Sequence, residues 1–295
     1  MKLSILIPTF NTDCRSLVEE LHRQLPEDCE IIVGDDGSSQ EDIKNANRLA
    51  IEGLSGVTFW ESERNRGRAG MCNQLIRRAQ GTYVLIMDAD AQVMSDNYLD
   101  TYLQQMPTDD VLCGGIRHPE TSPSPSVSLR WRYEKHCEPH LTPKIRNAHP
   151  YLSLSTFNIL LPRKVVLSHP FDEGITQYGY EDTLLGYQLE KAGIGIRHIG
   201  NPLMHLGLDV NARYLQKTEE AMQTLYGIRE KIGDHSQLLR TYDRLHRLHL
   251  LPALRQTYRL TRGAVRHNLL GPRPSILLFQ FYKLGYYAVL AHNES

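Results

Sequence analysis

The chain has 295 residues, of which 41% are hydrophobic and 23% are charged, which is enough apolar material for the core of one large domain or of a domain with an appendage. Its formal net charge of −1 argues against a partner recognised by overall charge. The five cysteines are odd in number and form no C-x-x-C pair, which is typical of reduced thiols in a cytosolic protein. The most apolar stretch, 275–291, is shorter than the roughly 20 residues of a spanning helix.

Predicted strands and helices alternate from the start of the chain. The strands are expected at Leu3–Ile7, Glu30–Gly34, Val57–Trp60 and Tyr83–Met87, and the helices at Cys14–Gln24, Glu41–Glu52 and Arg68–Ala79. This alternation implies right-handed crossovers. The fold class is therefore α/β, with a Rossmann-like, mainly parallel central sheet flanked by helices.

The pattern loosens between Cys113 and Arg163, where an irregular segment is expected to belong to a substrate site or lid. Further elements are expected as a helix at Leu129–Glu138, a strand at Ser155–Leu161, a helix at Asp182–Ala192 and a strand at Gly195–Ile199. From Asn211 the chain is predicted to be helical to about Arg266. We therefore expect a first domain at 1–210, followed by a helical C-terminal region at 211–295.

The strand Tyr83–Met87 ends in two aspartates, Asp88 and Asp90. Ligand sites of open α/β sheets lie at the carboxyl ends of strands. Two carboxylates there suit Mg²⁺ or Mn²⁺, which also takes phosphate oxygens, so the expected ligand is a nucleotide diphosphate. The alternative is a solvated, Asp-rich turn.

Five segments in order resemble the family 2 glycosyltransferases of the GT-A fold. They are Leu3-Ser-Ile-Leu-Ile-Pro8-Thr9-Phe10-Asn11, Ile31-Ile-Val-Gly-Asp35-Asp36-Gly37-Ser38-Ser39, Asn65-Arg66-Gly67-Arg68 with Asn73, Asp88-Ala-Asp90, and the Glu181-Asp182 helix that ends at Gly193. The resemblance covers about residues 1–207. It implies that 1–210 is a catalytic domain, with a nucleotide-sugar half at 1–112 and an acceptor half at 113–210. One departure is Cys72, where many relatives have Arg.

The resemblance implies a role for each motif. The nucleotide of the donor would be contacted by Pro8, Thr9, Asn11, Asp35 or Asp36, Asn65, Gly67, Arg68 and Asp88. Asp90 would ligate Mn²⁺ or Mg²⁺ directly, Asp88 would lie nearer the ribose and a metal-bound water, and His205 is a further candidate ligand. Asp182 would be the catalytic base for inverting transfer, with Glu181 contacting the acceptor or supporting the helix. For Asp36 the alternative is a helix cap, and for Glu181 and Asp182 it is stabilisation of a helix N-terminus.

Positive charge is concentrated near the C-terminus. The segment Arg240–Arg273 has eight arginines and one acid, Asp243, for a net charge of +7, so the rest of the chain carries −8. Arginines at helical spacing alternate with leucines, which predicts contact of residues 240–291 with an anionic membrane surface. The alternative is an appendage packed on the catalytic domain or on a second subunit of a homodimer. No feature indicates a nucleic-acid partner.

The sequence thus predicts a metal-dependent inverting glycosyltransferase, cytoplasmic or peripheral on the inner face of the membrane. Its donor would be a UDP-sugar and its acceptor a saccharide or a lipid-linked saccharide. One alternative is a non-catalytic nucleotide-binding scaffold. A sugar nucleotidyltransferase is disfavoured because the loop Pro8–Asn11 lacks a Gly-rich, basic triphosphate loop, and an NAD-linked oxidoreductase because no G-x-G-x-x-G follows the first strand.

Overall fold

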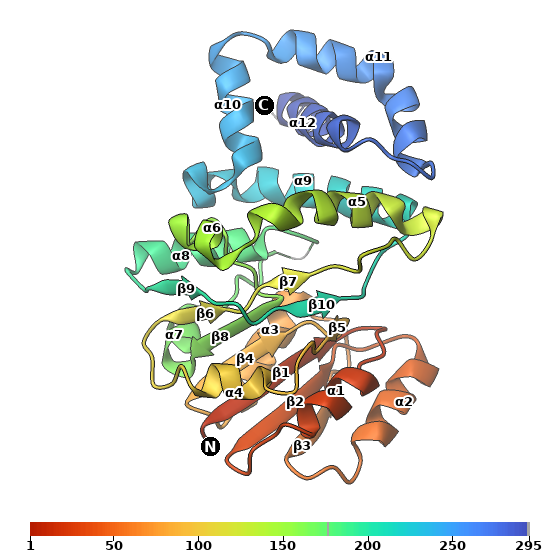
Figure 1. Cartoon of the computed structure of the whole chain (residues 1–295). Coiled ribbons are helices and arrows are strands. Elements are labelled where there is room, and N and C mark those ends of the chain that lie inside the picture. The colour runs from red at the N-terminus through yellow and green to blue at the C-terminus, as the bar shows by residue number, and fades with distance from the viewer. Residues whose placement is uncertain (176, 294–295) are drawn as a thin grey trace. The chain divides into compact units, whose positions relative to one another are not determined.

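The computed structural model describes residues 1–175 and 177–293, so the last two residues of the predicted C-terminal region lie outside it (Figure 1). The chain forms two compact units. The first comprises Met1–Arg117, His140–Thr176 and Leu185–Gly207. The second comprises His118–Pro139, Gln177–Leu184 and Leu208–Ser295. The predicted domain boundary at residue 210 remains a prediction.

The first unit is built on a seven-stranded sheet with the order β3-β2-β1-β4-β8-β6-β9. Its strands are β1 (Leu3–Thr9), β2 (Cys29–Asp35), β3 (Val57–Glu61), β4 (Tyr83–Met87), β6 (Val111–Cys113), β8 (Asn158–Pro162) and β9 (Ile196–His198). All neighbouring pairs are parallel except those of β8, which runs antiparallel to β4 and β6. The predicted α/β class with a mainly parallel sheet is therefore confirmed.

Helices cover both faces of this sheet. Those of the first unit are α1 (Arg15–His22), α2 (Glu41–Ile51), α3 (Gly67–Arg78), α4 (Tyr98–Leu103), α6 (Pro143–Ala148) and α7 (Arg163–Ser168), and α8 (Glu181–Lys191) begins in the second unit and continues in the first. Successive side chains of a strand point to opposite faces, so Ile5 and Ile7 pack with α1, α2 and α4 while Leu6 packs with α3, α7 and α8. Both faces of β1 are buried, which places the loop that follows it at a rigid sheet edge.

A second, three-stranded sheet of the first unit was not predicted from the sequence. It has the order β5-β10-β7, formed by β5 (Ala91–Gln92), β10 (Leu203–His205) and β7 (Ile116–Arg117). Strands of two or three residues are too short to show an alternating pattern. In this sheet His205 pairs with Ala91, the residue that follows Asp90. The predicted metal-binding histidine is therefore held opposite the end of the Asp-x-Asp motif.

The second unit is helical. Its helices are α5 (Ser128–Cys137), α9 (Asn211–Ile232), α10 (Gln237–Arg247), α11 (Leu251–Leu270) and α12 (Ile276–Asn293), with short 3₁₀ turns at Pro125–Val127, Glu138–His140 and Gly233–His235. Helix α12 packs against α9 and α11 around buried Tyr258, Phe279 and Tyr282. Pro252 lies in the first turn of α11, where proline has no helical hydrogen bond to lose. Among the described residues no helix has both the length and the hydropathy needed to cross a bilayer.

Candidate functional site

A cavity of about 280 Å³ lies in the first unit, where the loops after β1, β2 and β4 meet. Its lining residues come from those three loops and from the start of α3. They are Pro8, Thr9, Phe10, Thr12, Asp36, Asn65, Gly67, Arg68, Met71, Asp88, Ala89 and Asp90. Seven of the residues predicted for the nucleotide and both aspartates of the Asp-x-Asp motif thus lie around one cavity.

The loop after β1 is fixed by Asn11, which does not line the cavity itself. Its backbone has a φ of 52°, a left-handed conformation that asparagine tolerates. The Asn11 backbone N–H donates to Ser38 Oγ at 2.8 Å, and its side-chain Oδ1 accepts from the Gln40 backbone N–H at 2.9 Å. Asn11 therefore ties the β1 loop to the β2 loop and leaves its neighbour Phe10, 44% exposed, at the cavity.

The two aspartates after β2 have different surroundings. Asp35 is buried, and its carboxylate accepts from the Ser38 backbone N–H at 2.9 Å and from the Ser38 hydroxyl at 2.6 Å. Asp36 lines the cavity and accepts from the Arg66 backbone N–H at 2.8 Å. Desolvation by burial raises the pKa of Asp36 to about 6, although the hydrogen bond from Arg66 opposes the rise. Of the pair, Asp36 is therefore the carboxyl at the cavity, and Asp35 holds its own loop in shape.

Gly37 allows the β2 loop to approach the Arg64–Asn65 backbone. A Cβ at Gly37 would lie 2.8 Å from the Asn65 nitrogen, and its φ of +69° also favours glycine. Asn65 in turn accepts from the Gly67 backbone N–H at 2.9 Å, which shapes the turn into α3. These contacts place the start of α3 at the cavity.

Arg68 forms a short ion pair with Asp88. Its Nη2 lies 2.6 Å from Asp88 Oδ1, and Nε donates to the same oxygen at 3.1 Å. The guanidinium also donates to the Thr156 hydroxyl at 2.7 Å and to the Thr156 carbonyl at 3.0 Å. The sequence analysis placed Arg68 at the nucleotide and gave no reason to single out Thr156. The geometry shows a third role, because Arg68 compensates the charge of Asp88.

Asp90 lies beside His205. Asp90 Oδ2 is 3.4 Å from His205 Nε2, and the Asp90 carbonyl accepts from the Leu206 backbone N–H at 2.9 Å. The imidazole is buried and meets the Phe157 ring edge-on, with centroids 5.3 Å apart. A Cβ at Gly207 would lie 1.6 Å from Asp90 Oδ2, so any other residue there would displace the Asp90 carboxylate. A carboxylate oxygen and an imidazole nitrogen at this separation are suitable donors for Mn²⁺.

The predicted base lies in the second unit. Glu181 and Asp182 form the acidic first turn of α8, directly after Tyr180, which has a φ of 67°. Trp131 of α5 donates its indole N–H to the Pro119 carbonyl at 2.8 Å within the same unit.

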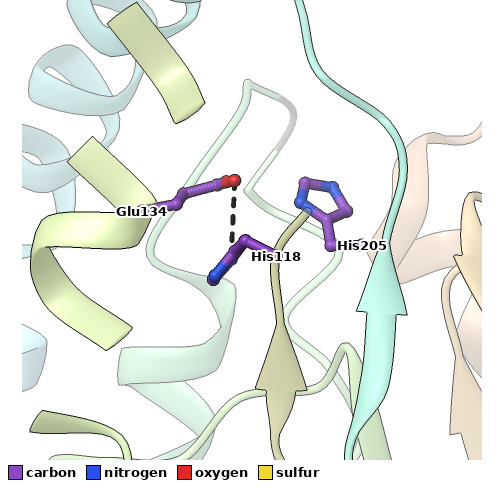
Figure 2. A group of neighbouring side chains, drawn as sticks. All are labelled: His118, Glu134 and His205. Atoms are coloured by element: carbon purple, nitrogen blue, oxygen red, sulfur yellow. Dashed lines mark ion pairs between the residues drawn. The ribbon is translucent and has the colours of Figure 1, made fainter. Parts of the chain in front are cut away.

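A buried histidine of the second unit was missed by the sequence analysis. Figure 2 shows the ion pair of His118 with Glu134, at 3.5 Å, and also draws His205 at the end of β10. The other ring nitrogen of His118 lies 3.0 Å from Glu138 Oε2. With a carboxylate at each nitrogen, His118 links the chain entering α5 to that helix. No spacing pattern in the sequence indicated a role for His118. Its partners lie on α5 and in the 3₁₀ turn after it, and only the folded chain brings them to the imidazole.

Comparison with protein families decides the classification. The model of the family "Glycosyl transferase family 2" matches residues 4–160, which include the cavity loops and the Asp-x-Asp motif. The chain belongs to glycosyl transferase family 2. The resemblance read from the five motifs is thereby confirmed.

Two relatives are themselves uncharacterised glycosyltransferases. YfnE of Bacillus subtilis is 25% identical over 247 residues, which are 67% of this chain and 62% of the relative. A protein of Haemophilus influenzae is 28% identical over 97 residues, which are 32% of this chain and 38% of the relative. The chain therefore spans less than two thirds of the length of these relatives.

Solved structures share the fold at low identity. A mannosyltransferase from Pyrobaculum calidifontis, in complex with GDP-Man and Mn²⁺, superposes with a TM-score of 0.61 at 16% identity, covering 99% of this chain and 86% of that one. TarS residues 1–349 of S. aureus, with UDP-GlcNAc, gives 0.51 at 16% identity, covering 76% and 66%. Glucosyl-3-phosphoglycerate synthase from Mycobacterium tuberculosis, with Mn²⁺, UDP and glucosyl-3-phosphoglycerate, gives 0.52 at 16% identity, covering 76% and 79%. These similarities support the GT-A fold.

Proposed function

We propose that the chain transfers a sugar from a nucleotide-diphosphate donor, a UDP-sugar, to a saccharide or lipid-linked saccharide with inversion at the anomeric carbon. The observation that carries the proposal is the cavity of the first unit, which has the Asp36 carboxyl among its lining residues together with the Asp88–Asp90 pair. A nucleotide diphosphate needs both kinds of group, an acceptor for base N–H donors and ligands for a divalent cation.

Within this proposal the residues divide the work. Asp36 accepts from the base, and the Pro8–Asn11 and Asn65–Arg68 loops enclose the nucleoside. Arg68 fixes the Asp88 carboxylate, so that its remaining oxygen faces the ribose. Asp90 and His205 would hold Mn²⁺ or Mg²⁺, and the bound cation would supply positive charge beside the diphosphate. Similar structures in complex with Mn²⁺ support this metal class.

Asp182 accepts the proton of the acceptor hydroxyl as the new glycosidic bond forms. A carboxylate within hydrogen-bond reach of the nucleophile contributes typically 10²–10⁴-fold to the rate. Attack of that hydroxyl oxygen on the anomeric carbon, from the side opposite the diphosphate, breaks the bond to the diphosphate in a single displacement and gives an inverted product. Glu181 assists by contacting the acceptor or by stabilising the first turn of α8.

The membrane partner and the location are part of the proposal. We place the enzyme in the cytoplasm, peripheral on the inner face of the membrane, with part of the 240–291 segment contacting anionic lipid. The charge of Arg240–Arg273 supports this placement.

Hydrolysis of a panel of UDP- and GDP-sugars with Mn²⁺ tests the function. We expect one UDP-sugar to be hydrolysed slowly, to yield initially the anomer opposite to that of the donor, and to react at least 100-fold more slowly with Asp182→Asn. Asp96→Asn, an exposed carboxylate in the first unit, is the matched control and should retain the wild-type rate. If the donor binds but neither protein hydrolyses it, nor transfers its sugar to any saccharide offered, the scaffold alternative replaces the enzyme.

A further inference from the structure

The arginines of α10 and α11 are largely without carboxylate partners. Arg266 pairs with Glu219 at 3.2 Å. Four others are exposed and form no ion pair with any carboxylate among the described residues, namely Arg244, Arg247, Arg259 and Arg262. No Asp or Glu occurs in the sequence between Asp243 and Glu294. The acids of the second unit that the structure describes therefore leave these four arginine charges without an ion pair.

Exposed leucines occur in the same stretch of the chain as these arginines. Leu248 and Leu250, in the turn between α10 and α11, are 56% and 46% exposed, and Leu260 on α11 is 79% exposed. A leucine so exposed has lost little of its apolar surface to the fold, and burying it elsewhere is favourable by about 25 cal/mol per Å². We name the four arginines and three leucines together the α10–α11 surface.

Helix α12, the apolar part of the C-terminal segment, is turned inward instead. Figure 1 shows α12 enclosed by α9, α10 and α11. Its Phe279, Tyr282 and Tyr287 are buried, and Lys283 lies over the Tyr133 ring at 4.5 Å. Burial lowers the pKa of Lys283 to about 8. Apart from Leu277 at its start, the described apolar side chains of α12 are at least partly covered, so α12 is a core helix of the unit.

We infer that the α10–α11 surface is the docking surface for a bilayer containing anionic phospholipid, and that α12 takes no direct part. Leucines enter the boundary between headgroups and acyl chains while arginines beside them reach the phosphates. A second copy of the chain would bring arginine against arginine with no acid between them, which disfavours a symmetric dimer here. A nucleic acid would neutralise the arginines but would leave Leu260 without an apolar environment.

Flotation of the full chain with liposomes at low salt tests the inference. One set of vesicles contains phosphatidylcholine alone, and the other also contains phosphatidylglycerol at about one lipid in three. We expect binding only to the anionic vesicles and its loss at roughly 0.5 M salt. Arg259→Gln/Arg262→Gln should lower the partition coefficient about thirty-fold, since each arginine contributes about fivefold. Arg23→Gln/Arg132→Gln removes the same charge from other exposed positions and should change binding much less.

The apolar part needs its own variant. Leu260→Ser should weaken vesicle binding at least about threefold, and Leu49→Ser, at another largely exposed leucine on α2, should not. Failure of wild type to float with anionic vesicles overturns the inference, as does equal loss with either arginine pair. Binding to an oligonucleotide as tight as to vesicles, with no effect of Leu260→Ser, would show a general polyanion site instead. The assay needs no nucleotide sugar, so its outcome is independent of the proposed reaction.

Discussion

The carboxyl of Asp36 is predicted to reduce the stability of the fold that carries it. It is 4% exposed, and the hydrogen bond that it accepts from Arg66 comes from the neutral backbone N–H and not from a charged side chain. Replacing it by Asn keeps an oxygen that accepts the same hydrogen bond and removes the charge. We therefore expect Asp36→Asn to raise the free energy of unfolding near neutral pH and to weaken binding of the nucleotide.

The magnitude and its pH window follow from the raised pKa. Burial raises the pKa of Asp36 from 3.8 to about 6, and a difference of about two in pKa corresponds to at most about 3 kcal/mol. Below pH 3.8 the carboxyl is protonated in both the folded and the unfolded chain, so it costs nothing. Between pH 3.8 and 6 the unfolded chain ionises while the folded chain keeps its proton. Above pH 6 the full cost is present.

Urea unfolding of wild type and Asp36→Asn between pH 4 and pH 8 measures this window. The variant should be close to wild type at pH 4 and more stable by about 1–3 kcal/mol at pH 7. Asp96→Asn, an exposed carboxylate, should stay within about 0.5 kcal/mol of wild type throughout. If the difference in free energy of unfolding between Asp36→Asn and wild type does not grow with pH, the reasoning is refuted. Burial of the Asp36 charge would then not be the cause of the lower stability of wild type.

Three other substitutions test the geometry of the site. Gly207→Ala would place a Cβ 1.6 Å from the Asp90 carboxylate, so Mn²⁺ affinity should fall at least about tenfold in a calorimetric titration, whereas Gly263→Ala, with nothing within 4 Å, should leave it unchanged and stabilise α11 by up to about 1 kcal/mol. Arg68→Met leaves an uncompensated carboxylate at the cavity and should weaken binding of UDP by about 2 kcal/mol at constant metal concentration. Asn158→Ala leaves two buried tyrosine hydroxyls without their acceptor and should lower the free energy of unfolding by about 3 kcal/mol in urea.

The parts of the fold that were predictable have long, regular signals. The strands β1, β2 and β4 are continuous apolar runs ending in polar loops, and both β1 faces are buried as such runs imply. The loop motifs predicted which residues meet at the cavity, because the carboxyl ends of parallel strands lie at one edge of the sheet. The antiparallel direction of β8 was not predictable, since it depends on the path of the chain between Cys113 and Asn158, which no local pattern sets.

The parts that were not predictable depend on contacts between distant segments. The pairing of Arg68 with Asp88 joins positions twenty apart, and Thr156 completes it from a loop that carries no motif. The β5-β10-β7 sheet, which sets Asp90 beside His205, consists of strands too short to show a period. Likewise, the inward packing of α12 could not be told from a surface-seeking helix, because an apolar helix has the same composition in either place.

The central claim is that the cavity binds a nucleotide diphosphate through a divalent metal held at Asp90. Calorimetric titration of UDP into wild type, with and without Mn²⁺, and into Asp90→Asn and Asp96→Asn measures it directly. We predict binding to wild type that requires Mn²⁺, loss of that binding in Asp90→Asn, and wild-type affinity in Asp96→Asn. Equal binding of UDP to Asp90→Asn and wild type, or no binding of UDP, GDP or their sugars with Mn²⁺ present, would contradict the account.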